Sequence, residues 1–244
     1  AVSFDPKGGT FRNEFYPEYK ANRDAQPEDI TIALPYIKQI LEAFKIPILT
    51  IDNYEADDVI GTLAKQAEKE GFNVYMVTPD KDFGQLVSEN IFMYKPSRRG
   101  NGIEILGEDE VKEKWQIERV DQVIDVLGLQ GDSVDNIPGI PGIGPKTAAA
   151  LLEHFPSLDE IFAQVDTVSD LKIRGAARIQ NLLREHKETA LLARRLTGVA
   201  TDPDMKVGAD DIARRTVDRD ALAAVCDGLG LGRMTTARLS RTVL

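Results

Sequence analysis

Three carboxylates crowd the boundary between two kinds of sequence pattern. Residues 46–51 form an apolar run typical of a buried strand, and Val59 begins a stretch with the spacing of an amphipathic helix. Between them stand Glu55, Asp57 and Asp58. Ligands collect at the carboxyl ends of strands in an open parallel sheet, so these acids are candidate metal ligands. The helix dipole also favours acids at a helix N-terminus, and simple capping accounts for the cluster equally well.

The alternation of strand and helix patterns around this cluster predicts the fold class. Strands are expected at residues 1–4, 46–51, 73–78, 91–94 and 103–106, and helices at 27–44 and 55–70. Such alternation predicts an α/β fold with a mostly parallel sheet flanked by helices. From residue 108 onward the pattern is helical. We therefore expect an α/β region over residues 1–106 and a helical region over residues 107–244.

Composition narrows the class of protein. The lone Cys226 excludes an internal disulfide and fits a reducing cytoplasm. No run of about 18 apolar residues is present, so we expect no membrane partner. The net charge of −10 argues against simple electrostatic affinity for nucleic acid. Residues 1–136 carry 15 Lys and Arg against 26 Asp and Glu, whereas residues 137–244 carry 15 against 14, so the excess acid lies in the half that contains Glu55.

Further acids follow the expected strand ends or open helices. They are Asp5, Asp80, Asp82, Asp132 and Asp135. Parallel strands all end at the same edge of a sheet, so we expect these acids to lie near the first cluster. Oxygen ligands without His or Cys suit Mg²⁺ or Mn²⁺ rather than Zn²⁺. The number of carboxylates exceeds the need of one ion and fits a two-metal site that cleaves a phosphodiester.

Residues 138–147 form a glycine- and proline-rich segment. They have the glycine spacing and the Lys-Thr pair of a P-loop, but Pro145 separates the last glycine from the lysine, and no strand precedes the segment. A helix-hairpin-helix fits better, because its glycines let backbone N–H groups approach a phosphate of duplex DNA without reading sequence. A plain turn between helices is the alternative. The candidate DNA contacts here are Gly139, Gly142, Gly144, Lys146 and Thr147.

Residues 11–23 interleave aromatic and basic side chains. Such a mixture can stack on bases and pair with phosphates, which makes Arg12, Tyr19, Lys20 and Arg23 candidate DNA contacts. An irregular surface segment whose aromatic side chains pack inward is the alternative. If the segment becomes helical, Lys20 and Arg23 share one face because they are three residues apart.

Together these motifs resemble the flap endonuclease family, as represented by the 5′-nuclease region of bacterial DNA polymerase I. The resemblance covers residues 1 to about 155, and the C-terminal third matches only in its helical character. It implies a PIN or resolvase-like α/β fold followed by a helical region with a helix-hairpin-helix. The stretches that carry it are Phe4-Asp5, Phe11-Arg12, Glu18-Tyr19-Lys20-Ala21-Asn22-Arg23, Tyr54-Glu55-Ala56-Asp57-Asp58, Thr78-Pro79-Asp80-Lys81-Asp82, Gly131-Asp132-Ser133-Val134-Asp135-Asn136 and residues 139–147.

The resemblance also implies roles for these residues. Asp58 matches an acid beside the family's metal ligands, and Lys20 and Arg23 match catalytic basic residues of a helical arch that faces the scissile phosphate. Residues 139–146 match the hairpin that holds the duplex, where the family also binds K⁺ through backbone carbonyls. The implied cofactors are two Mg²⁺ ions, which Mn²⁺ can replace, and K⁺. The acids that match metal ligands are Asp5, Glu55, Asp57, Asp80, Asp82, Asp132 and Asp135.

The implied activity is metal-dependent hydrolysis of DNA phosphodiesters near 5′ ends, at 5′ flaps or duplex junctions, in replication and repair. We expect a cytoplasmic, nucleoid-associated bacterial monomer in which a polymerase region follows Leu244. The family opens with a strand that ends in a metal-binding Asp upstream of Asp5, and we expect this strand to be missing from the chain. A catalytically impaired module that binds DNA junctions is therefore the alternative. A structural protein with a solvated acidic face is the least favoured hypothesis.

Overall fold

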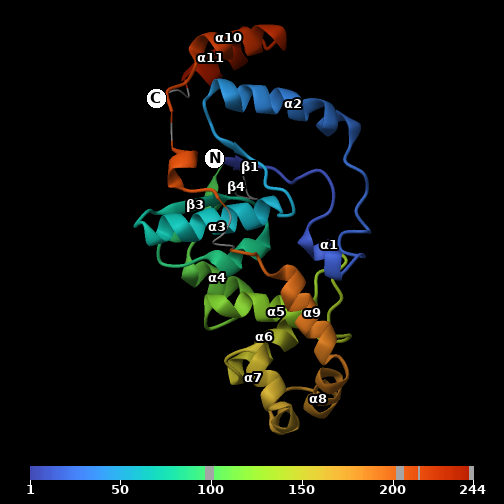
Figure 1. Cartoon of the computed structure of the whole chain (residues 1–244). Coiled ribbons are helices and arrows are strands. Elements are labelled where there is room, and N and C mark those ends of the chain that lie inside the picture. Colours follow the sequence, from blue (N-terminus) through green and yellow to red (C-terminus); the bar gives the residue numbers. More distant parts are fainter. Residues whose placement is uncertain (97–101, 202–205, 214, 242–244) are drawn as a thin grey trace.

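The structure is a computed structural model of the 244-residue chain, and it describes residues 1–96, 102–201, 206–213 and 215–241. An α/β part lies above a helical part, and a small helical lobe caps the top (Figure 1). The helices are α1 (Phe11–Phe15), α2 (Glu28–Ala43), α3 (Ala56–Lys69), α4 (Glu108–Trp115), α5 (Val123–Gln130), α6 (Pro145–His154), α7 (Leu158–Ala163), α8 (Ala176–Glu185), α9 (Lys187–Thr197), α10 (Arg219–Gly228) and α11 (Arg233–Arg241), with short 3₁₀ helices η1 (Lys81–Leu86), η2 (Val120–Gln122), η3 (Val165–Asp170) and η4 (Ala209–Ile212).

The strands of the described residues form two sheets rather than one. Strand β1 (Val2–Ser3) pairs in parallel with β2 (Ile48–Leu49). Strand β3 (Val74–Val77) pairs in parallel with β4 (Ile91–Pro96), which pairs antiparallel with β5 (Ile103–Leu106). The predicted α/β class and the predominance of parallel pairing are confirmed. The single sheet that we expected is divided, because β1 and β3 each have only one partner strand among the described residues.

Helix α3 forms where the sequence predicts it. It begins just after Glu55, and it ends before Gly71, whose φ of +87° lies in the left-handed region that glycine adopts readily. Its inner face buries Val59, Leu63 and Ala64 against the sheets. The sheet edge and the acidic turn before α3 are thereby held together by the apolar face of one helix.

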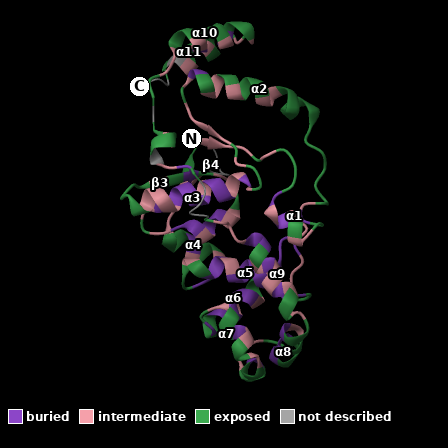
Figure 2. Ribbon diagram, viewed as in Figure 1, coloured by how far each residue is buried: buried purple, intermediate pink, exposed green. Residues whose placement is uncertain are grey.

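The largest apolar core lies between the sheet β3–β4–β5 and the helices below it. Leu127 of α5, Leu151 of α6 and Leu183 of α8 are all fully buried in this core. Purple, buried segments of α3, α5 and α9 mark its extent in Figure 2. Helices α5 and α9 touch so closely that a Cβ on Gly128 would lie 2.9 Å from Cβ of Arg194.

The lobe at the top brings α2 together with α10 and α11, which lie near the end of the sequence (Figure 1). Helix α2 packs there against α10, where Ala43, Leu222 and Cys226 form a separate buried cluster. The backbone N–H of Asp218 donates to the carbonyl of Ala43, and Lys45 pairs with the Asp218 carboxylate at 3.5 Å. No helix among the described residues is long and apolar enough to cross a membrane.

The segment between α5 and α6 is the predicted helix-hairpin-helix. Gly131 has a φ of +71°, and a Cβ on Gly139 would lie only 2.0 Å from the carbonyl oxygen of Gln130. Gly139 is therefore required by backbone packing inside the protein, not by a ligand. Gly144, by contrast, has no atom within 4 Å of the position its Cβ would take, and Pro145 follows it as the first residue of α6.

The two glycines of the hairpin should therefore respond differently to substitution. We expect Gly139→Ala to lower the free energy of unfolding by about 2 kcal/mol or more, because the Gln130 backbone must move. Gly144→Ala should cost less than about 1 kcal/mol, since its surroundings are open. Urea unfolding followed by circular dichroism measures both. Equal losses for the two variants would contradict the close packing of Gly139.

Candidate functional site

Four segments bring their acids to one edge of the α/β part. Asp5 follows β1 and accepts a hydrogen bond from the backbone N–H of Ala56 at 2.8 Å, which fixes it at the start of α3. Asp80 and Asp82 follow β3, and the Asp80 carboxylate accepts from the backbone N–H of Asp82 at 3.0 Å. The remaining acids come from the first turn of α3 and from the loop after α5: Glu55, Asp57, Asp132 and Asp135.

Asp57 lies at the centre of one group of these acids. Burial, together with the negative charges of Asp80, Glu55 and Asp5, raises the pKa of its carboxyl to about 7, and the ammonium of Lys20 opposes this shift. Asp57 is therefore an acid whose ionised form is disfavoured unless positive charge comes near.

Asp82 lies at the centre of a second group. Burial, together with the negative charges of Asp80, Asp132 and Asp135, raises its pKa to about 7, and Lys81 opposes this shift. The Oδ1 atom of Asp82 is buried and has no hydrogen-bond partner among the described residues. A buried oxygen without a donor is costly for the protein alone, and a cation would relieve that cost. Because Asp80 acts on both Asp57 and Asp82, the two groups are neighbours.

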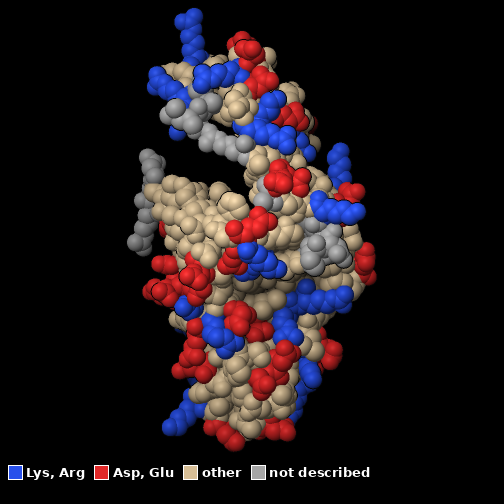
Figure 3. All heavy atoms as spheres, turned by 60° about the vertical axis from the view of Figure 1, so that its left-hand side comes forward, with Lys and Arg blue, Asp and Glu red and all other residues tan. Residues whose placement is uncertain are grey.

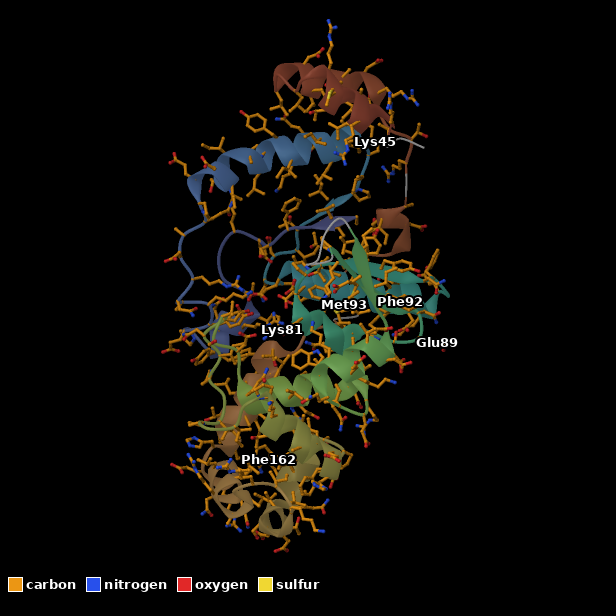
Figure 4. The ribbon with its side chains drawn as sticks, turned by 180° about the vertical axis from the view of Figure 1, so that it is seen from behind. Lys45, Lys81, Glu89, Phe92, Met93 and Phe162 are labelled. Carbon is orange, nitrogen blue, oxygen red and sulfur yellow. The ribbon has the colours of Figure 1, made fainter. Side chains whose placement is uncertain are left out.

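Lys81 is a residue of this site that the sequence analysis missed. Its ammonium donates to Asp132 Oδ2 at 2.8 Å and lies 3.9 Å from Asp82 Oδ1. Burial lowers its pKa, but the hydrogen bond to Asp132 and the surrounding carboxylates outweigh burial and raise it. Lys81 lies where the α/β part meets the helical part (Figure 4). Its position between Asp80 and Asp82 in the chain was the signal that could have identified it.

Lys20 and Arg23 form ion pairs with acids of this edge. The Lys20 ammonium is 2.7 Å from Glu55 Oε1 and 3.8 Å from Asp135 Oδ2, and Arg23 pairs with Asp135 Oδ1. Their segment is docked by the Asn22 side chain, which donates to the carbonyl of Ser133 at 2.9 Å. Opposite charges are likewise interleaved on the face drawn in Figure 3, where no large area carries one sign.

Arg12 and Asp58 have a different environment from the one expected. Two hydrogen bonds of 2.7 and 2.8 Å join the Arg12 guanidinium to the Asp58 carboxylate, and the side chains are 3% and 0% exposed. Arg12 also donates to the carbonyls of Leu196 and Gly198. Burial would lower the pKa of Arg12, but Asp58 outweighs it and raises the pKa. A guanidinium enclosed in this way cannot reach DNA, so the expectation of a DNA contact at Arg12 is corrected.

Asp58 is equally unsuited to bind a metal ion. Besides Arg12, it accepts hydrogen bonds from the backbone N–H groups of Glu55 at 3.0 Å and Ala200 at 2.8 Å. Its oxygens are thus occupied by four donors inside the protein. Asp58 therefore positions the first turn of α3. This is the helix-capping role that we considered as the alternative to metal binding.

Tyr19 is also buried rather than free to stack on a base. It is 5% exposed and packs with Phe15 and Leu196, as the inward-packing alternative anticipated for this segment. Its hydroxyl donates to Glu55 Oε2 at 3.1 Å, and burial together with the Glu55 charge raises the Tyr19 pKa well above its usual range. Tyr19 therefore orients Glu55 and lies behind the acids.

The donor set fits a hard divalent cation. Every candidate ligand is a carboxylate oxygen, and Asp82 Oδ1 is a buried oxygen that lacks a donor. No three Asp, Glu, His or Cys side chains in the described part of the chain converge on one point as ligands. The acids expected to bind metal are therefore neighbours, but Lys20, Lys81 and Arg23 lie among them. Asp5, Glu55, Asp57, Asp80, Asp82, Asp132 and Asp135 remain the residues that could hold such ions.

The hairpin is joined directly to this acidic edge. The backbones of Asp132 and Ile137 exchange two hydrogen bonds, of 3.0 and 2.7 Å, at the base of the loop. Beyond Ile137, Gly142 and Lys146 are exposed, and Gly144 and Thr147 are partly exposed at the start of α6. The surface that we expect to bind DNA therefore continues from the loop that carries Asp132.

Neighbouring aspartates of α3 should respond oppositely to loss of charge. We expect Asp58→Asn to lower the free energy of unfolding by about 3 kcal/mol or more, because the buried Arg12 guanidinium loses its hydrogen-bonded counter-ion and keeps only Glu55, at 3.7 Å. Asp57→Asn should leave stability unchanged or raise it at pH 8, since it removes repulsion. Urea unfolding without divalent metal measures both, and a larger loss at Asp57 would refute these assignments.

The raised pKa of Asp82 predicts a pH dependence. The folded protein holds this proton up to pH about 7, whereas the unfolded chain loses it near the ordinary value of 3.8. The contribution of this carboxyl to the free energy of unfolding is therefore fully present below about pH 4, and it is lost as the pH rises to about 7. We expect Asp82→Asn to raise the melting temperature of the metal-free protein at pH 8 by several degrees, with no gain at pH 4.

The exposed Asp170 of η3 provides the control, because Asp170→Asn should not change the melting temperature at either pH. Saturating Mn²⁺ at pH 8 should stabilise the unsubstituted protein more than Asp82→Asn. A gain from Asp82→Asn that is equal at pH 4 and pH 8 would contradict the electrostatic explanation.

Comparison with known proteins shows the family to which this chain is related. A family model described as 5′-3′ exonuclease, N-terminal resolvase-like domain, matches residues 1–116, and one described as 5′-3′ exonuclease, C-terminal SAM fold, matches residues 118–220. DNA polymerase I of Bacillus caldotenax is 38% identical over 229 residues, which are 94% of this chain and 25% of the polymerase. The 5′-3′ exonuclease of Buchnera aphidicola is 37% identical over 211 residues, which are 86% of this chain and 72% of that protein.

Solved structures share the fold. T5 5′-exonuclease with bound divalent metal ions (zinc) has a TM-score of 0.64 and 21% identity, covering 99% of this chain and 80% of that chain. The catalytic core of Rad2 in complex with DNA substrate has a TM-score of 0.62 and 16% identity, covering 99% and 79%. The chain spans about a quarter of the DNA polymerase I relatives that it matches. With both family models matched over most of its length, the chain belongs to the 5′-3′ exonuclease family.

Proposed function

We propose that this chain is a structure-specific 5′→3′ exonuclease and flap endonuclease that hydrolyses DNA phosphodiesters near 5′ ends. The observation that carries the proposal is the edge where acids of four segments gather, among them Asp82, whose buried Oδ1 atom has no hydrogen-bond partner in the described part of the chain. The DNA substrate is supported by similar folds: the Rad2 catalytic core is described with DNA substrate, and the T5 D15 flap endonuclease with DNA and metal ions.

The acids have the role of holding two Mg²⁺ ions, or Mn²⁺ in their place. One group of ligands lies around Asp57, the other lies around Asp82, and Asp80 faces both. Divalent ions bound there activate water and stabilise the negative charge that develops on the phosphate. Tyr19 and Lys20 orient the Glu55 carboxylate through its two oxygens. Because the pKa values of Asp57 and Asp82 are raised to about 7, both carboxylates are ionised, and therefore able to bind a cation, above about pH 7.

The basic residues and the hairpin act on the DNA. Lys20 lies at the acidic edge itself, so its ammonium is placed to stabilise charge on the scissile phosphate. Arg23, whose side chain is 48% exposed, can exchange Asp135 for a phosphate. The hairpin holds the duplex backbone through Gly142, Gly144 and the start of α6, and its backbone carbonyls would hold K⁺. Cleavage and grip are thereby assigned to different parts of one surface.

A binding module without strong catalysis is the second candidate. It is favoured by the absence, in the described ranges, of three acids that converge on one point, and by the pairing of Lys20 and Lys81 with the acids. A 5′-labelled flap substrate separates the two functions. We expect cleavage near the 5′ junction with Mg²⁺ and none with EDTA. Tight binding of the flap without cleavage at saturating Mg²⁺ or Mn²⁺ would support the binding module instead.

Lys20 should contribute to the rate more than to affinity. We expect Lys20→Ala to slow single-turnover cleavage by roughly 10²-fold or more, as for loss of one electrostatic stabiliser. Its affinity for the flap should change by less than about tenfold, because other groups hold the duplex.

Lys45→Ala is the matched control, since Lys45 also pairs with an aspartate but lies beside α10, away from the acids (Figure 4). It should cleave at the normal rate. A normal rate for Lys20→Ala at saturating enzyme, with poor binding, would make Lys20 a simple phosphate clamp.

A further inference from the structure

Helix α8 lies directly against the turn of the hairpin. A Cβ on Gly142 would lie 3.5 Å from Nη2 of Arg178 and 3.8 Å from Cδ1 of Leu182. These two α8 residues are one helical turn apart and therefore share a face. Gly142 itself has a φ of +85° and is exposed. The packing thus places a guanidinium beside the exposed backbone of the hairpin, 36 residues further along the chain.

Among the residues that the structure describes, Arg178 lacks the ion pairs that two arginines near it form. Arg184 on the same helix pairs with Asp166, and Arg194 pairs with Asp159 and Asp125. Within residues 102–201, no carboxylate forms an ion pair with Arg178, and its side chain is exposed. In a chain with a net charge of −10, an arginine that packs on a glycine turn and pairs with no carboxylate of residues 102–201 is available to bind an external anion.

The chemistry of this corner fits a phosphate diester. A guanidinium presents a planar fork of N–H donors that matches two phosphate oxygens. The first N–H groups of α6, which follow Gly144 and Pro145, have no intrahelical partner and are therefore donors that suit the same kind of anion. Lys146 adds a second positive charge on α6. Neither contact involves a base edge, so the corner can hold backbone without reading sequence.

We propose that Arg178 binds a backbone phosphate of duplex DNA next to the hairpin and so extends the grip from α6 to α8. This inference rests on the proposed binding of duplex DNA by the hairpin. It adds a residue of α8, beyond the hairpin, where the sequence motifs gave no DNA contact. Arg178 is a binding residue, far along the chain from the acids, and should leave the chemical step unaffected.

The test compares variants of α8 in duplex binding with EDTA present, so that cleavage does not interfere. We expect Arg178→Ala to weaken binding roughly 3- to 10-fold and to reduce the salt dependence of log Kd by about one ion. Duplexes of unrelated sequence should lose affinity alike. Arg178→Lys should keep the salt dependence but recover only part of the affinity, since a point charge replaces the fork.

Arg184→Ala is the matched control, because it removes an arginine of the same helix that is already paired with Asp166. It should bind duplexes as the unsubstituted protein does. Unchanged affinity and salt dependence for Arg178→Ala, or an equal loss for Arg184→Ala, would overturn the inference.

The outcome is independent of the test of catalysis. If flaps are not cleaved but Arg178→Ala still weakens duplex binding, the nuclease proposal fails and this inference stands. If flaps are cleaved and Arg178→Ala binds normally, only this inference fails. With cleavage active, Arg178→Ala should raise KM and keep kcat, a result that a general loss of folding would not give.

Discussion

Repulsion among carboxylates at one edge is the constraint on which the rest of this structure depends. Acids this close cannot all ionise without positive charge among them. The free protein supplies that charge from Lys20, Lys81 and Arg23. The loop that carries Asp135 therefore also holds the segment of Lys20, and the two order each other through backbone and side-chain hydrogen bonds. The same crowding leaves Asp57 and Asp82 with raised pKa values and makes a divalent cation a favourable addition.

The Arg12–Asp58 ion pair lies close to these acids and has a structural role. It is buried, fully hydrogen-bonded and linked to the carbonyls of Leu196 and Gly198. Through it the first turn of α3 is fixed to the end of α9, so the parts that match two separate family models are locked together. Asp57 and Asp58 are adjacent in sequence, yet one faces the acidic edge and the other faces the interior. Their division of labour follows from which face of the helix each occupies.

Local patterns predicted much of this arrangement. Helix α3, its end before Gly71 and the hairpin before α6 all follow from periodicity and turn residues. The acidic edge follows from acids placed after strands. What could not be predicted depends on partners far along the chain. The burial of Arg12 needs Leu196, 184 residues away, and the packing role of Gly139 needs the Gln130 carbonyl. The position of Lys81 between two aspartates indicated a place at the site, but its pairing with Asp132, 51 residues away, could not be predicted.

The short loop from Asp132 to Ile137 gives the proposed function its geometry. Asp132 pairs with Lys81 through its carboxylate, while its backbone exchanges two hydrogen bonds with Ile137. Asp132 and the start of the hairpin are therefore parts of one small backbone unit. A duplex held by backbone groups on the hairpin would present its phosphodiester at a fixed distance from the acids, whatever its sequence. Such a link between the DNA-binding hairpin and the acidic edge favours recognition of DNA shape rather than of base sequence.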